Sequence, residues 1–211
     1  MSPPLNIRQN RRLVSWHRVD RGHAPASRLV SRIPMDLQSD AVIPFPRLDV
    51  FVTYRDQTLA LSRYLPDVRG VEIRSRKEDG PMVEVVSDWR GGGEIPTIAR
   101  AVLSDAMLSW TDHTRWNADT LSCEFRTETR ALTEAFRCGG KTLFTDDGSG
   151  ATRMSVRGTL TIDASKIRGI PGFLAGRVGR AIEDAIGGSI QRNLVATARG
   201  LTALLEQRGG A

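Results

Sequence analysis

Cysteine and histidine are scarce in this chain of 211 residues. The two cysteines, Cys123 and Cys138, are too few for a disulfide framework or a tetrahedral metal site. Of the three histidines, only His113 lies after residue 34, so neither a histidine metal site nor a Ser-His-Asp triad is expected in the folded part. We therefore predict no metal and no cofactor.

Long apolar runs are also missing. No stretch approaches the roughly 20 residues that a membrane span requires, and the N-terminus lacks the apolar core of a secretory signal. We therefore predict a soluble, cytoplasmic protein with no membrane span and with reduced thiols.

Negative charge is scarce in residues 1–34, which contain seven arginines and a single acidic residue, Asp20. This segment accounts for the whole formal charge of +6, so the chain is formally neutral from Met35 onward. A basic face for nucleic acid is therefore not expected on the folded domain, and we predict no nucleic-acid partner for it.

Residues 1–34 also show no period-2 or period-3.6 pattern, which predicts a disordered basic extension before a domain at 35–211. Three interpretations compete: an organelle transit peptide, a nucleic-acid-binding arm, and an upstream extension before a true start at Met35. We favour the third because the ordered pattern begins at Met35.

From Met35 the pattern predicts a strand, short helices, more strands and one long helix. A strand at 36–43 ends at Pro44-Phe45-Pro46, and Pro66 closes the helical stretch that follows. Asp79-Gly80 predicts a hairpin turn. The other predicted elements are strands at 68–76 and 82–89, a short helix or turn around 98–103, strands at about 106–116, 120–129, 132–145 and 151–163, and a helix at about 171–207.

The four later strands alternate so that one sheet face is apolar and the other polar. Turns at Asn117-Ala118, Arg130-Ala131 and Gly148 set the expected register. The predicted cross-strand pairs are Trp110 with Phe125, Asp112 with Cys123, Phe125 with Phe136, Cys123 with Cys138, Phe136 with Leu160, Phe144 with Thr152 and, on the polar face, Glu124 with Arg137. The remaining polar face is predicted to hold His113, Arg115, Ser122, Arg126, Arg153, Ser155 and Arg157.

The last helix carries apolar residues that step by four, starting at Leu174 and Val178. Because each step of four drifts by about 40° around a straight helix, the stripe must be reset. Gly187-Gly188 lies where this reset is needed, so we predict a bend or break there. The apolar sheet face requires this helix to pack over it.

The element order resembles that of the START-like (SRPBCC) superfamily, which includes polyketide cyclases and lipid-transfer domains. The local cues are Ile43-Pro44-Phe45-Pro46, Tyr64-Leu65-Pro66-Asp67-Val68 before Val71-Glu72-Ile73, and Ile95-Pro96 before a strand ending in Arg115-Trp116. The last of these cues is similar to a little-characterised bacterial branch of the superfamily, and the resemblance as a whole covers about residues 36–207. The resemblance implies an α+β helix-grip fold, in which a curved antiparallel sheet of about seven strands wraps around the C-terminal helix, with two short helices after the first strand. It also implies a pocket between sheet and helix.

Two carboxylates, Asp112 and Glu134, are predicted on the apolar inner face, where an unpaired charge is unfavourable. They are candidate general acids or polar anchors for a ligand, unless they lie near the wet mouth of the pocket. The predicted ligand-binding residues are Trp110, Asp112, Phe125, Glu134, Phe136, Met154, Ile182 and Ile186.

Three functions remain open. The first is a carrier or sensor that binds a hydrophobic small molecule or lipid. The second is an enzyme of the polyketide cyclase or dehydratase kind, with Asp112 or Glu134 moving a proton. The third is a protein-interaction module whose cavity is filled. An inward carboxylate of raised pKa favours the enzyme, an open cavity without one favours the carrier, and a packed interior favours the interaction module.

Overall fold

A computed structural model describes residues 34–92, 97, 108–130, 133–167, 170 and 173–209 of the chain. The predictions for residues 1–33 and for a helix around 98–103 therefore lie outside the described residues. The elements are β1 (Met35–Ile43), α1 (Arg47–Asp56), α2 (Thr58–Leu61), η1 (Ser62–Tyr64), β2 (Val68–Asp79), β3 (Met82–Gly91), β4 (Ser109–Asn117), β5 (Ser122–Thr129), β6 (Phe136–Asp146), β7 (Thr152–Ile162), η4 (Ala164–Lys166) and α3 (Ala175–Gly209).

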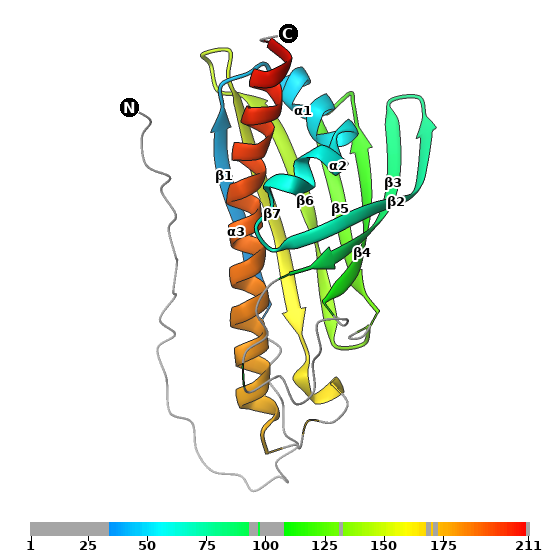
Figure 1. The fold of residues 1–211 in the computed structure, drawn as a ribbon, viewed down its shortest axis with the longest axis vertical. Coiled ribbons are helices and arrows are strands. Elements are labelled where there is room, and N and C mark those ends of the chain that lie inside the picture. The colour runs from blue at the N-terminus through cyan, green and yellow to red at the C-terminus, as the bar shows by residue number, and fades with distance from the viewer. Residues whose placement is uncertain are drawn as a thin grey trace, which may run out of the picture.

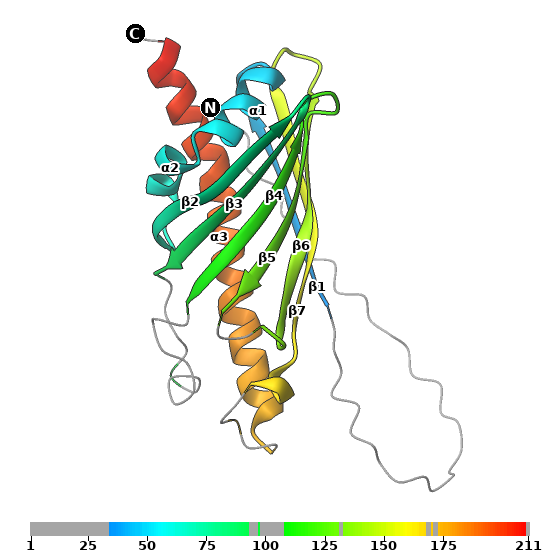
Figure 2. The same ribbon diagram turned by 90° about the vertical axis from the view of Figure 1, so that its right-hand side faces the viewer.

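The strands form one antiparallel sheet in the order β1-β7-β6-β5-β4-β3-β2. The long helix α3 runs along one face of the sheet, and α1 and α2 lie at one end of that face (Figure 1). Figure 2 shows the sheet curving around α3. This is the predicted helix-grip fold, with the two short helices placed after the first strand as expected.

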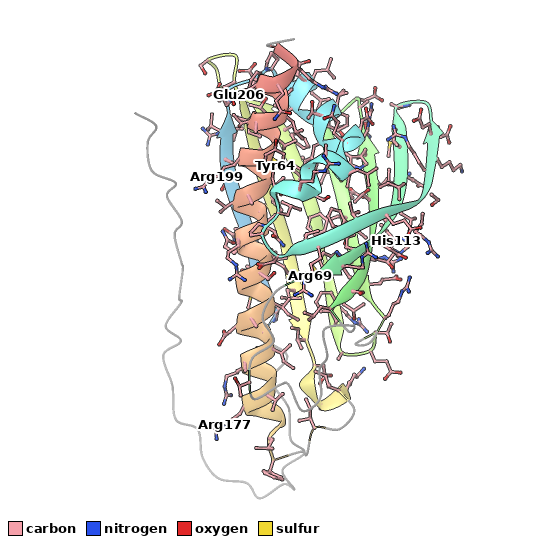
Figure 3. The ribbon with its side chains drawn as sticks, in the orientation of Figure 1. Tyr64, Arg69, His113, Arg177, Arg199 and Glu206 are labelled. Carbon is pink, nitrogen blue, oxygen red and sulfur yellow. The ribbon has the colours of Figure 1, made fainter. Side chains whose placement is uncertain are left out.

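Local sequence explains how the first elements reach this arrangement. Along β1 every second residue is buried, which is the period-2 pattern of a strand covered on one face. Pro46 precedes α1, where its fixed φ and missing N–H suit the start of a helix. Gly200 of α3 then permits close packing, since a Cβ there would lie 2.7 Å from Cδ1 of Leu61. Tyr64, labelled in Figure 3, packs against the same glycine.

The predicted cross-strand register is wrong, although the residues of the predicted pairs lie on their predicted faces. Trp110 faces Thr129 and Asp112 faces Thr127. The remaining observed pairs are Phe125 with Gly140, Cys123 with Thr142, Cys138 with Thr127, Glu124 with Lys141, Phe136 with Ile162 and Phe144 with Met154. Each pairing moves by an even number of residues from the predicted one, so every side chain keeps its face.

The turns after β4 and β6 explain the shifts on either side of them, because each is centred later in the chain than predicted: Asn117 pairs with Ser122 and Asp146 with Thr152. After β4, the side chain of Asn117 accepts hydrogen bonds from the backbone N–H groups of Asp119 and Thr120 (2.9 and 3.2 Å), and Leu121 adopts a φ of 45°. After β6, Asp147 Oδ1 accepts the N–H groups of Ser149 and Ala151 in the same way. By contrast, the β2–β3 hairpin is as tight as predicted and turns at Gly80, whose φ is 56°.

The helix α3 runs unbroken through Gly187 and Gly188, so the predicted break is wrong. Gly187 instead allows close approach of β1, since a Cβ there would lie 2.5 Å from the sulfur of Met35. The drifting stripe is accommodated because its two halves contact different parts of the core. No described helix combines the length and the apolarity needed to cross a membrane.

The core consists of two clusters rather than one. The cluster at the start of α3 contains Leu37, Ala135, Phe136, Cys138, Leu160, Ile162, Ile167, Val178 and Ile182. The cluster at the end of α3 is built around α1 and contains Ala41, Ile43, Val50, Phe51, Leu61, Val83, Val85, Trp116, Cys123, Phe144, Met154, Leu201, Leu204 and Leu205. The interior between these two clusters holds the candidate site.

We expect Gly140→Ala to lower the free energy of unfolding by about 1–3 kcal/mol, the usual effect of overpacking. Gly140 faces Gly158 across β6 and β7, and a Cβ on Gly140 would lie 2.6 Å from Cα of Gly158 and 2.9 Å from Cζ of Phe125. Backbone atoms cannot yield as a flexible side chain can. Urea unfolding of the variant and the parent chain measures the difference.

The matched control is Gly187→Ala, for which we expect a change close to zero. The new methyl meets only the flexible end of Met35, and alanine is a better helix former than glycine by about 1 kcal/mol. Equal effects of the two substitutions would contradict the close contact between β6 and β7.

Candidate functional site

A cavity of about 320 Å³ lies between the sheet and α3, lined also by residues of α1 and α2. Its walls are largely apolar and aromatic. The aromatic residues that line it are Tyr54, Trp89, Trp110, Trp116, Phe125 and Phe136. The cavity adjoins both core clusters, because Phe136 and Ile182 belong to the first and Trp116 to the second.

The three cavity tryptophans are held in place by the strands that carry them. Each indole N–H donates a hydrogen bond to the side chain two residues away on its own strand, which lies on the same face of the sheet. These bonds run from Trp89 to Ser87 Oγ (2.9 Å), from Trp110 to Asp112 Oδ2 (3.2 Å) and from Trp116 to Thr114 Oγ1 (3.1 Å). Trp89 and Trp110 are cross-strand neighbours and stack with parallel rings, 6.0 Å between centroids.

Asp112 is the carboxylate of the cavity interior. Its Oδ1 accepts a hydrogen bond from Thr127 Oγ1 on the neighbouring strand (2.5 Å), and its Oδ2 accepts the bond from Trp110. Asp112 is half-buried and lines the cavity. The carboxylate is therefore oriented from two sides and open to the cavity on another.

Burial raises the pKa of Asp112 to about 6, because the surroundings cannot solvate its charge as water does. The hydrogen bonds from Thr127 and Trp110 and the nearby His113 act in the opposite direction and limit the rise. A carboxyl group with this pKa exchanges its proton near neutral pH, as a general acid or base must.

The two thiols and the phenol beside Asp112 are neutral at physiological pH. Burial, reinforced by the charge of Asp112, raises the pKa of the Cys138 thiol to about 12. The same two causes raise the pKa of Cys123, and burial raises that of Tyr54. Both cysteines are free and buried, as predicted, but they are not cross-strand neighbours. A thiol of raised pKa is a poor nucleophile, so neither cysteine suits covalent catalysis.

Thr129 contributes a polar group without a partner. Its hydroxyl is buried and makes no hydrogen bond to any described residue, although it belongs to the cavity wall. Thr129 faces Trp110 and lies two residues beyond Thr127 on β5, on the same face as Asp112. A buried hydroxyl without a partner is unfavourable by roughly 1–3 kcal/mol.

The cavity reaches the surface beside Arg192, which lines it and is still 57 % exposed. Arg192 donates two hydrogen-bonding contacts to Asp67 Oδ2, at 2.9 Å from Nε and 2.8 Å from Nη2. Asn193 Oδ1 accepts the backbone N–H of Asp67 (3.3 Å). The charges at this opening are therefore paired with each other.

No protein-family model matches the sequence, and no curated protein matches it. Solved structures do match. TTHA0849 from Thermus thermophilus is 17% identical, with a TM-score of 0.56 over 81% of this chain and 99% of its own. The Zhui aromatase/cyclase from Streptomyces sp. R1128 is 16% identical, with a TM-score of 0.56 over 83% of this chain and 96% of its own. This chain shares their fold.

A third match is the di-domain ARO/CYC BexL from the BE-7585A biosynthetic pathway, 15% identical with a TM-score of 0.51. It matches over 80% of this chain, which spans 50% of that longer protein. These neighbours agree with the predicted START-like resemblance at the level of the fold. Identities this low carry no information about the reaction or the ligand.

Within this helix-grip fold, six of the eight predicted ligand-binding residues line the cavity. They are Trp110, Asp112, Phe125, Phe136, Ile182 and Ile186. Met154 does not line it, because it is 1% exposed and packed in the second core cluster. Glu134 is not on the inner face: it lies exposed in the turn before β6 and borders a separate small pocket near η4. The prediction for Glu134 is wrong because β6 begins at Phe136 and not at residue 132.

His113 lies on the outer face of the sheet, as predicted, with Nε2 3.5 Å from Glu128 Oε2. Figure 3 shows it at the side of the sheet, away from α3. Among the described residues, no three His, Cys, Asp or Glu side chains gather as metal ligands do.

Sequence reasoning missed several residues of the cavity wall. Trp89 was detectable, since the tight β2–β3 hairpin and the period-2 pattern place it on the inner face. Tyr54 follows Phe51 by three residues on α1 and so shares its buried side. No local signal identifies Thr127 or Thr129, whose roles depend on the exact register of β4 and β5.

Proposed function

We propose that this chain is a carrier or sensor that binds a hydrophobic small molecule or lipid in the cavity between the sheet and α3. The observation that supports the proposal is the unfilled, aromatic-walled cavity of about 320 Å³. Protein interiors are close-packed, with few voids larger than a water molecule. The volume lies within the range of small-molecule sites, roughly 300–1,000 Å³. The interaction-module alternative requires a packed interior and is therefore not favoured.

The test is to fill the cavity from α3. We expect Ala185→Phe to weaken binding of the neutral fluorescent probe N-phenyl-1-naphthylamine to the full chain at least tenfold. A tenfold change corresponds to a loss of about 1.4 kcal/mol of binding free energy. Ala185 lines the cavity, so the new ring would occupy the space of the probe. Fluorescence titration measures the affinity, and urea unfolding checks that the variant folds.

The matched control is Ala196→Phe, a substitution on the same helix at a position that does not line the cavity. It should bind the probe as the parent chain does. Failure of the parent chain to bind the probe, or equal binding by Ala185→Phe, would overturn the proposal. Native mass spectrometry of the purified chain, followed by denaturation, would show the mass of any molecule that co-purifies.

A second candidate function is an enzyme that moves a proton to or from its ligand. The raised pKa of Asp112 favours it, because this carboxyl group is oriented by Trp110 and Thr127 and faces the cavity. Asp112 would have to act alone, since Tyr54, Cys123 and Cys138 hold their protons too tightly to exchange them near neutral pH. By the criterion drawn from the sequence, an inward carboxylate of raised pKa favours the enzyme. We still rank this candidate second, because no other described group beside the cavity complements Asp112 as a second acid or base.

A further inference from the structure

We propose that the cavity selects hydrophobic molecules that carry a protonated amine, with Asp112 as the counter-ion. This inference rests on the proposed binding function and names the class of ligand.

Among the described residues, the charges that line the cavity do not all pair with each other. Three charged side chains of these residues line it: Asp67, Arg192 and Asp112. Asp67 and Arg192 pair with each other at the opening. Asp112 has only neutral hydrogen-bond donors, from Trp110 and Thr127, and no cation pairs with it among the described residues. A buried carboxylate without a cation is unfavourable, so a cationic ligand would relieve it and an anionic ligand would be repelled.

Asp112 has acceptor sites to spare. A carboxylate offers about four lone-pair sites, and Asp112 uses two of them within the protein. An ammonium group has donors only and therefore matches the remaining acceptor sites of Asp112.

Aromatic side chains form the cavity wall around Asp112. Trp110 donates to Asp112 and stacks on Trp89, and Phe125 lies on the neighbouring strand β5. Aromatic faces attract cations through their quadrupole and also accept a flat apolar skeleton. The same wall therefore favours both parts of a hydrophobic amine.

The test uses three probes with one skeleton: 2-naphthylmethylamine, 2-naphthylmethanol and 2-naphthoic acid. Calorimetric titration of the full chain at pH 7.5 should give the amine an affinity roughly ten- to a hundredfold above that of the alcohol, as expected for a charge-assisted hydrogen bond, with the acid weakest. Asp112→Asn should remove this preference, because it keeps the shape of the side chain and removes the charge.

The control variant is Glu84→Gln, which changes the net charge equally but on the exposed outer face of β3, where Glu84 pairs with Arg115 (3.5 Å). It should leave all three affinities unchanged. If the alcohol binds as tightly as the amine, the inference is wrong and the proposed hydrophobic site stands. If none of the three probes and no N-phenyl-1-naphthylamine binds, the proposed function fails as well.

A pH series gives a second readout. The amine stays protonated between pH 5 and 7.5, whereas Asp112 gains its proton below a pKa of about 6. Amine affinity should therefore fall about tenfold from pH 7.5 to 5 and alcohol affinity should not. The groups that face Asp112 are Tyr54 from α1, Cys123 from β5 and Cys138 from β6, with His113 behind it and the Arg192–Asp67 pair at the opening. An amine affinity that does not change with pH would overturn the role of Asp112.

Discussion

Phe51→Ala should lower the free energy of unfolding by about 3–5 kcal/mol, the usual loss for removing a buried aromatic side chain. Phe51 of α1 is completely buried. Its ring meets those of Trp116 and Phe144 edge to face, at 5.5 and 5.6 Å between centroids. Truncation would leave a void behind Trp116, so the wall of the cavity would lose its support as well. Urea unfolding measures the effect.

The control is Leu48→Ala on the same helix, where the side chain is 56% exposed. We expect this substitution to change stability by less than about 0.5 kcal/mol. A loss below about 1 kcal/mol for Phe51→Ala would mean that α1 does not close this end of the core.

The fold and the faces of its strands were predictable because both depend on period rather than on exact pairing. Alternation places Asp112 and Phe125 on the inner face whichever even register the strands adopt. The register itself depends on turns such as that after Asn117, where a side chain caps backbone N–H groups and lengthens the loop. The prediction for Glu134 is wrong for a related reason. Period-2 alternation assigns a face only within a strand, and Glu134 lies in a turn.

The cavity was predictable only as an implication of the fold. The alternation of apolar and polar residues shows which side of a strand faces inward. It does not show whether the side chains of α3 fill the space above that side. Met154 and Phe136 both face inward, yet Met154 is packed in the core while Phe136 borders the cavity. The difference arises from the path of α3, which the glycines allow to approach β1 at Met35 and η1 at Tyr64. Such close approaches depend on the tertiary structure, which no local pattern encodes.

Asp112→Asn should stabilise the protein at neutral pH by up to about 3 kcal/mol. Burial raises the pKa of Asp112 from 3.8 to about 6, so the folded state holds this proton more tightly than the unfolded state. Such a group contributes stability below pH 4, and this contribution is lost as the pH rises through 6. Asparagine cannot ionise, and it can still accept from Trp110 and donate to Thr127. The advantage of the variant should therefore be full at pH 7.5 and absent at pH 4, as measured by urea unfolding at both values.

Asp88→Asn is the control of opposite sign. The hydrogen bond from Thr111 holds the pKa of Asp88 below its usual value, so its carboxylate contributes stability that is present at neutral pH and lost in acid. This variant should be less stable than the parent chain at pH 7.5. A carboxylate at position 112 that lowers stability fits a role in function, either as the counter-ion of a bound cation or as a group that transfers a proton. If Asp112→Asn is not more stable at pH 7.5, the carboxylate is solvated, and the preference for a cationic ligand loses its basis.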